Sequence, residues 1–330
     1  MNLEQLIGRL KKTPSFMENV THWETIPAKE ASFAPFPAEL DNRLPPVLAQ
    51  RGVYKLYSHQ REAFDLAATG KDICVVTPTA SGKTMCYNLP VLNAILKNND
   101  ARALYLFPTK ALSADQVSEL YELIEAMDVD VKTFTYDGDT PAAARRQVRQ
   151  AGHIVVTNPD MLHSGILPQH TKWVKLFENL QYIVIDEIHT YRGIFGSNLA
   201  NVLRRLMRLC EFYGSHPRFI LCSATIQNPR ELAETLIGRP VELIDQNGAP
   251  AGEKHYIFYN PPVVNAQLGI RKGVLPETRR IASLLVQNGV QSIVFAKSRL
   301  QVEVLTRQLK ELVSDPIGNS GKVRGYRGGY

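Results

Sequence analysis

Residues 77–84, Thr-Pro-Thr-Ala-Ser-Gly-Lys-Thr, have the types and order that hold the phosphates of a nucleotide. They follow an apolar stretch and open a helical pattern, and free N–H groups at a helix start attract anions. Thr77 replaces the first glycine of the usual loop, so the strand–loop–helix context carries the assignment. Gly82 permits close backbone approach, Lys83 reaches the β- and γ-phosphates, and the Thr84 hydroxyl ligates Mg²⁺. The residues expected to bind ATP in this loop are Thr79, Ala80, Ser81, Gly82, Lys83 and Thr84.

An acidic pair, Asp186-Glu187, closes another apolar stretch. In phosphoryl transfer Asp186 is placed to hold Mg²⁺, and Glu187 to polarise the attacking water. The alternative is an ordinary acidic turn after a buried strand. His189 is expected to bond toward Ser223 or Thr225, although a purely structural histidine is the competing interpretation.

Two further residues ahead of the phosphate loop suit a purine base. Gln60 can present a donor and an acceptor to adenine, with Tyr57 close to the ring. A helix start capped by Ser58 is a serious alternative, and both can hold at once.

Polar residues also follow other apolar stretches, where a parallel sheet exposes its carboxyl edge. Hydroxyls, helix-start N–H groups and a lysine suit sugar-phosphate contacts without sequence information. Each cluster alone is typical of a strand-end turn, so their shared edge is the argument for a nucleic-acid track. The residues are Pro108, Thr109, Lys110, Asp137, Gly138, Thr157, Asn158 and Pro159.

The elements that position these residues alternate between apolar strands and helices, which predicts an α/β fold with helices on both faces of a parallel sheet. Ligands of such sheets bind at the carboxyl ends of the strands. The predicted strands are 73–77, 103–107, 131–135, 153–157, 182–186 and 218–223. The predicted helices are 58–68, 83–96, 112–127, 141–150, 198–213 and 228–236.

The chain is long enough for two domains. Residues 1–52 are expected to be an extension packed along the first domain, with a helix over 38–50. Residues 53–245 form that domain, and 246–275 a linker. Residues 276–330 begin a second sheet, with helices over 277–287 and 298–312 and a strand over 292–296.

Composition narrows the class of protein. No apolar run reaches the roughly 18 residues that span a bilayer, and the N-terminus has no secretory layout, so a soluble cytoplasmic protein is expected. The four cysteines show no paired spacing, which argues against zinc in this segment and for buried thiols. The formal charge is +6, and residues 276–330 carry nine Lys or Arg against four acids. This excess favours a polyanionic partner, although a solvated helix face is the alternative.

Taken together, these motifs resemble superfamily 2 helicases with two RecA-like domains and an Asp-Glu-x-His signature. Residues 186–198, residues 56–60 and residues 295–299 are similar to the YprA/MrfA (mitomycin repair factor A) group of bacterial DNA-repair helicases, relatives of the Hrq helicases. The resemblance implies ATP with Mg²⁺, a single-stranded or tailed duplex DNA partner and 3′-to-5′ movement. It also implies coupling through Ser223, Ala224 and Thr225, and nucleic-acid contacts at Lys297, Ser298 and Arg299. We expect a monomer.

Two departures from the family matter. The arginine helix of the second RecA-like domain and the cysteine-ligated zinc domain are expected only beyond Tyr330, so this chain alone is expected to bind ATP and DNA weakly and not to turn over. An RNA helicase, or a nucleotide-dependent binding module without hydrolysis, are the alternatives.

Overall fold

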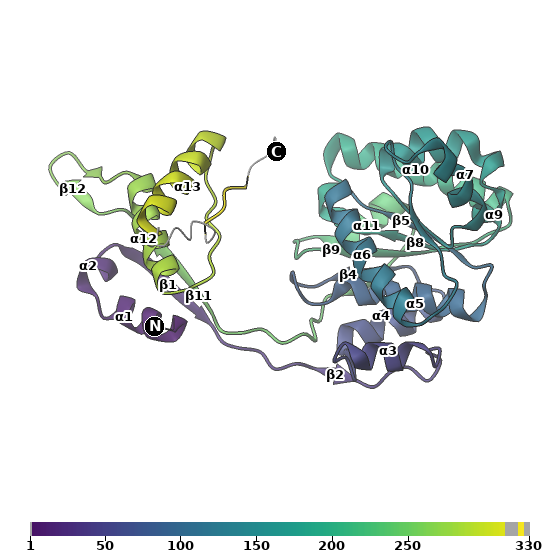
Figure 1. The fold of residues 1–330 in the computed structure, drawn as a ribbon, viewed down its shortest axis with the longest axis horizontal. Coiled ribbons are helices and arrows are strands. Elements are labelled where there is room, and N and C mark those ends of the chain that lie inside the picture. Colours follow the sequence, from purple (N-terminus) through teal and green to yellow (C-terminus); the bar gives the residue numbers. More distant parts are fainter. Residues whose placement is uncertain (1, 314–322, 327–330) are drawn as a thin grey trace. The chain divides into compact units, whose positions relative to one another are not determined.

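The computed structural model of the protein describes residues 2–313 and 323–326 (Figure 1). The chain divides into two compact units. Residues 29–251 form the larger unit, and residues 1–28 together with 252–330 form the smaller one. Each unit is described by itself.

The larger unit is built on a seven-stranded sheet in which every neighbouring pair is parallel, in the order β10-β4-β9-β8-β5-β7-β6. Strands β4, β5 and β7 are buried along their whole length, as continuous apolar strands between two helical layers should be. The parallel α/β fold is thereby confirmed. The strands are β4 (Ile73–Val76), β5 (Arg102–Leu106), β6 (Thr133–Thr135), β7 (Ile154–Thr157), β8 (Leu180–Ile185), β9 (Arg218–Ser223) and β10 (Glu242–Ile244).

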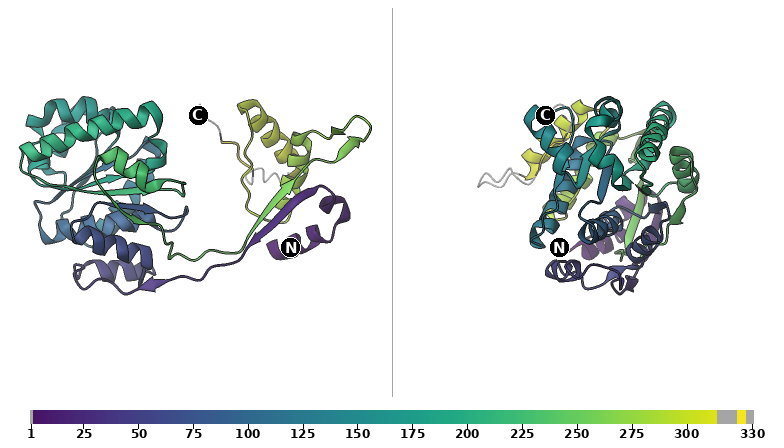
Figure 2. Two further views of the ribbon diagram at one scale, coloured as in Figure 1. Left: turned by 180° about the vertical axis from the view of Figure 1, so that it is seen from behind. Right: turned by 90° about the vertical axis from the view of Figure 1, so that its right-hand side faces the viewer.

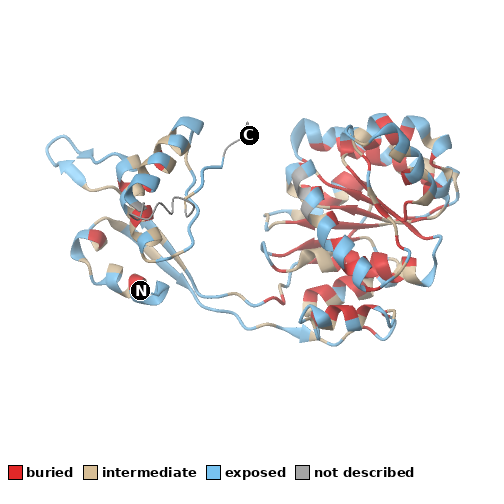
Figure 3. Ribbon diagram, in the orientation of Figure 1, coloured by how far each residue is buried: buried red, intermediate tan, exposed pale blue. Residues whose placement is uncertain are grey.

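Helices cover both faces of this sheet, and the buried side chains gather on the strands and on the helix sides that face them (Figures 2 and 3). One core packs α3 to α6 against the sheet, and a second core packs α7, α9, α10 and α11 against the other face. The helices are α3 (Leu44–Gln50), α4 (Ser58–Ala68), α5 (Lys83–Lys97), α6 (Lys110–Ala126), α7 (Ala142–Ala151), α8 (Pro159–Met161), α9 (Val174–Glu178), α10 (Gly193–Phe212) and α11 (Pro229–Ile237). Short turns η1 (Leu162–Ile166), η2 (Leu167–Lys172) and η3 (Ile188–Thr190) connect them.

The residues before the phosphate loop divide between the two units. Strand β2 (Phe33–Ala34) pairs with β3 (Leu56–Tyr57), and α3 buries Leu44 and Leu48 in the core of the larger unit. Helix α3 begins six residues later than the predicted start at 38, and Pro45 and Pro46 lie in its first turn, which tolerates the missing N–H. Residues 1–28 belong instead to the smaller unit, so only part of the extension packs along the sheet.

The smaller unit is held together by antiparallel pairing of β1 (Val20–Ile26) with β11 (Lys254–Tyr259). The segment 246–275, predicted as a linker, therefore contains a strand, and it also contains the short pair β12 (Val263–Asn265) and β13 (Ile270–Arg271). Phe16 stacks on Tyr259 with ring centroids 5.0 Å apart. The helices of this unit are α1 (Leu3–Lys11), α2 (Pro14–Met17), α12 (Val274–Gln287) and α13 (Arg299–Val313).

The strand predicted over 292–296 was wrong, because those residues carry no regular structure in the described chain. Four of its five residues are exposed, and no described strand lies beside it. Residues 314–322 and 327–330 of the predicted second domain lie outside the described residues. The assignment of 276–330 to a second RecA-like domain stays a prediction.

Candidate active site

The phosphate loop connects β4 to α5 as predicted. Gly82 precedes α5 with φ = +77°, a conformation that favours glycine. A Cβ at this position would lie only 2.6 Å from Gln60 Nε2, so the side chain of Gln60 would have to shift to accommodate any other residue. Ser81 is buried and its hydroxyl lies 2.6 Å from Thr77 Oγ1, which fixes the base of the loop. The threonine in place of the usual first glycine therefore has a structural role.

Lys83 and Thr84 stand at the first turn of α5. Lys83 Nζ donates to the carbonyl oxygens of Thr77 at 2.8 Å and Pro78 at 3.0 Å, so its ammonium lies over the loop that would hold the phosphates. Thr84 Oγ1 donates to Gln116 Oε1 at 2.8 Å. Gln116 comes from α6 and was not predicted, since a lone glutamine in a helical pattern gives no signal.

The acidic pair lies at the carboxyl end of β8, facing the same loop. Asp186 Oδ2 accepts from Tyr87 at 3.4 Å, and Oδ1 accepts from the Glu187 N–H at 2.8 Å. Glu187 has φ = +54°, a strained conformation for a residue with a side chain. Burial, and then the charge of Glu187, raise the pKa of Asp186 to about 6.

The acidic pair fits a divalent cation. Glu187 Oε2 is buried, and the polar atom beside it is His189 Nδ1 at 3.1 Å. Two adjacent, half-buried carboxylates are costly to ionise together unless a cation balances them. Magnesium is usually held by one or two carboxylates together with phosphates and water, so a cluster of three protein ligands is not required, and the described residues contain none. Asp186 and Thr84 are the residues that would hold it.

His189 connects two strand ends. Its Nδ1 lies 3.4 Å from Ser223 Oγ at the end of β9 and 3.1 Å from Glu187 Oε2. The predicted contact with Ser223 is therefore present, whereas Thr225 is exposed. Ala224 lies between them.

A pocket of about 370 Å³ beside the phosphate loop contains both residues predicted to meet the base, Tyr57 and Gln60. It is also lined by Phe33, Tyr54 and Met85, which were missed. Phe33 stacks on Tyr57 at 5.3 Å because β2 pairs with β3, and no short-range pattern announces that pairing. Helix α4 begins at Ser58 with Tyr57 as its N-cap, so Ser58 is not the cap.

Most of the residues predicted to contact nucleic acid lie together at the ends of β5, β6 and β7. Thr109, Lys110 and Gly138 are exposed, and Lys110 pairs with Asp139 and, at 3.6 Å, with Asp137. Thr157 differs from the expectation, because it is buried and its hydroxyl donates to Tyr136 O.

The remaining predicted contacts divide between the two units. Asn158 accepts from Met161 N–H and caps α8, Pro159 is buried beside it, and Pro108 is half-buried. Lys297, Ser298 and Arg299 are exposed in the smaller unit, where Ser298 Oγ accepts from Gln301 N–H at the start of α13.

The segment after the acidic pair folds back tightly into α10. Gly193 has φ = +57°, and a Cβ on Gly196 would lie 2.4 Å from Tyr191 O, so both glycines are required by the backbone. Tyr191 is buried, and its ring packs 5.3 Å from that of Phe195.

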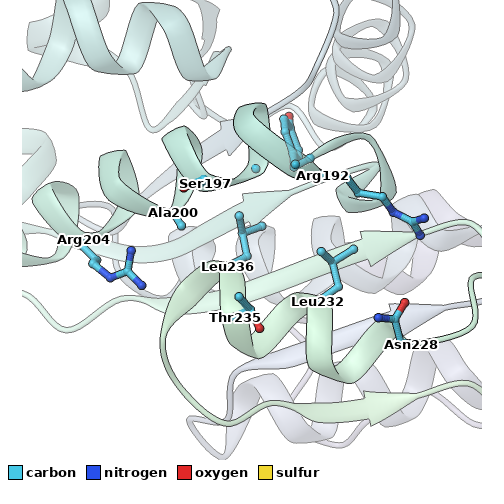
Figure 4. A pocket seen from close by; sticks show the side chains of 11 residues that line it. Arg192, Ser197, Ala200, Arg204, Asn228, Leu232, Thr235 and Leu236 are labelled. Atoms are coloured by element: carbon cyan, nitrogen blue, oxygen red, sulfur yellow. The ribbon is translucent and has the colours of Figure 1, made fainter.

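A groove of about 420 Å³ separates α10 from α11 (Figure 4). Leu232, Leu236 and Ala200 line it, and Arg192 and Arg204 lie toward its opposite ends (Figure 4).

Three comparisons with known proteins agree on the family. The model of the DEAD/DEAH box helicase family matches residues 57–233. The helicase YprA of Bacillus subtilis, described as an uncharacterized ATP-dependent helicase, is 57% identical over 100% of this chain and 43% of its own length. The ATP-dependent helicase HRQ1 of Saccharomyces cerevisiae is 36% identical over 99% of this chain and 31% of its own.

The crystal structure of the DUF1998 helicase MrfA bound to DNA and AMPPNP is also similar, with a TM-score of 0.92 and 56% identity over 96% of this chain and 44% of that one. The resemblance to the YprA/MrfA group and its Hrq relatives is thus confirmed. The chain spans less than half the length of these relatives.

Proposed function

Because the chain belongs to the DEAD/DEAH box helicase family, we propose that it binds ATP and DNA and acts as an ATP-dependent DNA helicase or translocase. The observation that carries the proposal is the convergence of Lys83, which follows β4, with Asp186 and Glu187, which follow β8, at one edge of the sheet, where β9 lies between the two strands. Motors of this kind use such an edge to place phosphates, a cation and water together.

The residues of the proposed ATP site have distinct roles. Lys83 neutralises the β- and γ-phosphates, and the pocket at Tyr57 and Gln60 receives the base. A bound Mg²⁺, held by Thr84 and Asp186, would supply charge neutralisation at the phosphates. Glu187 orients the attacking water, and His189 Nδ1, 3.1 Å from its Oε2, holds the carboxylate in place.

His189 connects the acidic pair to the edge of the sheet that is proposed to bind the nucleic acid. It lies near Glu187 on β8 and near Ser223 on β9, so a movement of either strand end alters the position of the other. We propose that Ser223, Ala224 and Thr225 couple nucleotide state to the rest of the protein through this contact.

The partner we propose is single-stranded or tailed duplex DNA. Exposed Thr109, Lys110 and Gly138 suit phosphate contacts, and the solved relative MrfA is described as bound to DNA. Movement in the 3′-to-5′ direction, action in DNA repair, a monomeric state and a cytoplasmic location complete the proposal. Among the described residues, no helix is long and apolar enough to cross a membrane.

The test compares DNA with RNA. Phosphate release would be measured with single-stranded DNA or RNA of one sequence, using the protein at the full length of its family. DNA should stimulate release and RNA should stimulate it far less. Equal or greater stimulation by RNA would contradict the proposal in favour of an RNA helicase, and nucleotide-dependent strand binding without release would favour a binding module.

A further inference from the structure

A second pocket, of about 350 Å³, opens between α8 and α10. Its volume lies within the roughly 300–1,000 Å³ typical of small-molecule sites. Buried Leu199 and Val202 form part of its lining, and Phe195, Asn198 and Arg205 line it from α10 as well. None of the residues that bind the phosphates or the base of ATP in the proposed function lines this pocket.

The position of this pocket follows from the order of the strands. Helix α8 starts directly after β7, and α10 follows the loop after β8. Strand β5 lies between β7 and β8 in the sheet and ends at Leu106, shortly before Thr109 and Lys110. The pocket therefore adjoins the carboxyl edge of the sheet, where the proposed function places the nucleic acid.

Phe195 offers an exposed and positioned aromatic surface. Its side chain is 41% exposed, and its ring lies 5.3 Å from that of Tyr191, which is only 1% exposed. The positive φ of Gly193 and the close approach at Gly196 fix the turn that presents it. A ring held in this way loses little conformational freedom when a ligand stacks on it.

The polar side chains around Phe195 match the remaining parts of a nucleotide. Arg205 Nη1 lies 2.9 Å from His163 Nδ1. This contact holds the guanidinium of Arg205 at the pocket, where it can bind a phosphate. Asn198 and Asn201 are exposed amides that can donate to or accept from a base edge, and Asp160 can accept. An apolar protein side chain could use the ring but would leave these groups unmatched.

We propose that this pocket receives one base of the bound strand, stacked on Phe195, with Arg205 toward an adjacent phosphate. The combination of an aromatic face, a cation and side-chain amides is the one by which proteins bind single-stranded nucleic acid. The proposal rests on the proposed function and adds to it a specific base subsite. Since every base has a π face, the subsite accepts any sequence.

The test measures binding of a labelled single-stranded oligodeoxynucleotide to this chain by fluorescence anisotropy at low salt. Phe195→Ala should weaken binding by about 5- to 150-fold, the equivalent of the roughly 1–3 kcal/mol of one stacked base. Phe195→Trp should bind like the wild type because it keeps the stacking surface. Phe212→Ala is the matched control, since Phe212 is 75% exposed at the other end of the same helix.

A strand with a single abasic position, moved along the sequence, gives a second measurement. One position should weaken wild-type binding by the same factor as Phe195→Ala, and the variant should be insensitive to it. Unchanged DNA binding by Phe195→Ala, or equal losses in Phe195→Ala and Phe195→Trp, would overturn the subsite and leave the surface to a protein partner. A wild-type chain that binds no strand at low salt would overturn the proposed function and this inference together.

Discussion

Gln60 Nε2 donates to the Gly82 carbonyl at 2.9 Å, while Gln60 Oε1 accepts from the Tyr57 N–H at 3.0 Å. One side-chain amide thus ties the base pocket to the phosphate loop. Each of its two polar atoms retains capacity for a further hydrogen bond, so the two interpretations of Gln60, as a helix-start residue and as a reader of adenine, are compatible.

Gln60→Ala should therefore weaken ATP binding by about tenfold, because both the loop contact and the base contact are lost, and about 1.4 kcal/mol corresponds to a tenfold change. Discrimination between ATP and GTP should fall as well. Competition titrations with a fluorescent ATP analogue measure both quantities. Gln147→Ala, on the exposed side of α7, is the control. Unchanged affinity with unchanged discrimination would show that Gln60 serves only the fold.

Lys83→Ala should reduce the affinity for ATP by about 10- to 100-fold, the usual worth of a hydrogen bond to a charged group. The fold should persist, since Lys83 donates to the loop carbonyls of Thr77 and Pro78 and lies outside the hydrophobic core. The same fluorescent titration, with circular dichroism as a check on folding, measures the effect. Lys175→Ala, an exposed lysine on α9, should bind like the wild type. Wild-type affinity in Lys83→Ala would remove the phosphate-loop assignment.

Glu187→Gln should retain ATP and DNA binding but lose turnover by about 10²–10⁴-fold, because the amide keeps the shape and removes the carboxylate that orients water. Phosphate release in the protein at the full length of its family is the measurement. Glu178→Gln, at the end of α9, controls for the loss of one negative charge. Near-normal release by Glu187→Gln would mean that the acidic pair is only a turn.

His153 makes the larger unit sensitive to acid. Burial, and then the charge of Arg102, lower its pKa to about 4, and its Nδ1 accepts from the Lys132 N–H. Below pH 6.5 the unfolded chain takes up a proton that the folded chain resists, so stability falls as the pH decreases from 6.5 toward 4. The loss should reach about 2 kcal/mol at pH 5.

Urea unfolding at pH 7.5 and pH 5 measures this loss. His153→Gln should show a smaller difference between the two pH values than the wild type. His216→Gln, at an exposed position of the same unit, should behave like the wild type. An equal difference in His153→Gln and the wild type would show that the acid sensitivity arises elsewhere.

The sheet was predictable wherever burial left a continuous apolar signal. Six of the seven parallel strands were found in this way, whereas β10 is only three residues long and one of the three, Glu242, is charged. The contacts within the phosphate loop and the acidic pair follow from motif spacing. Phe33 could not be found, because it reaches the base pocket through the β2–β3 pairing of distant segments.

Long-range pairing also explains the largest difference in the fold. Strand β1 is exposed except at half-buried Val20 and Trp23, and it meets β11 more than 220 residues away, so its sequence carries no local sign of its partner. Thr157 at the site was misjudged for a different reason. Its position at a strand end suggested a surface hydroxyl, but the residue is buried and satisfies a backbone carbonyl.

The β1–β11 pairing can form only late in the synthesis of the protein. Residues 20–26 leave the ribosome long before residues 254–259, and at roughly 5–20 residues per second the interval is about 10–50 s. During that time the parallel sheet of residues 29–251 can form as an insert, while β1 has no strand to pair with. An unpaired edge is a template for association with other chains, so the nascent chain is exposed to aggregation at its first strand until β11 emerges.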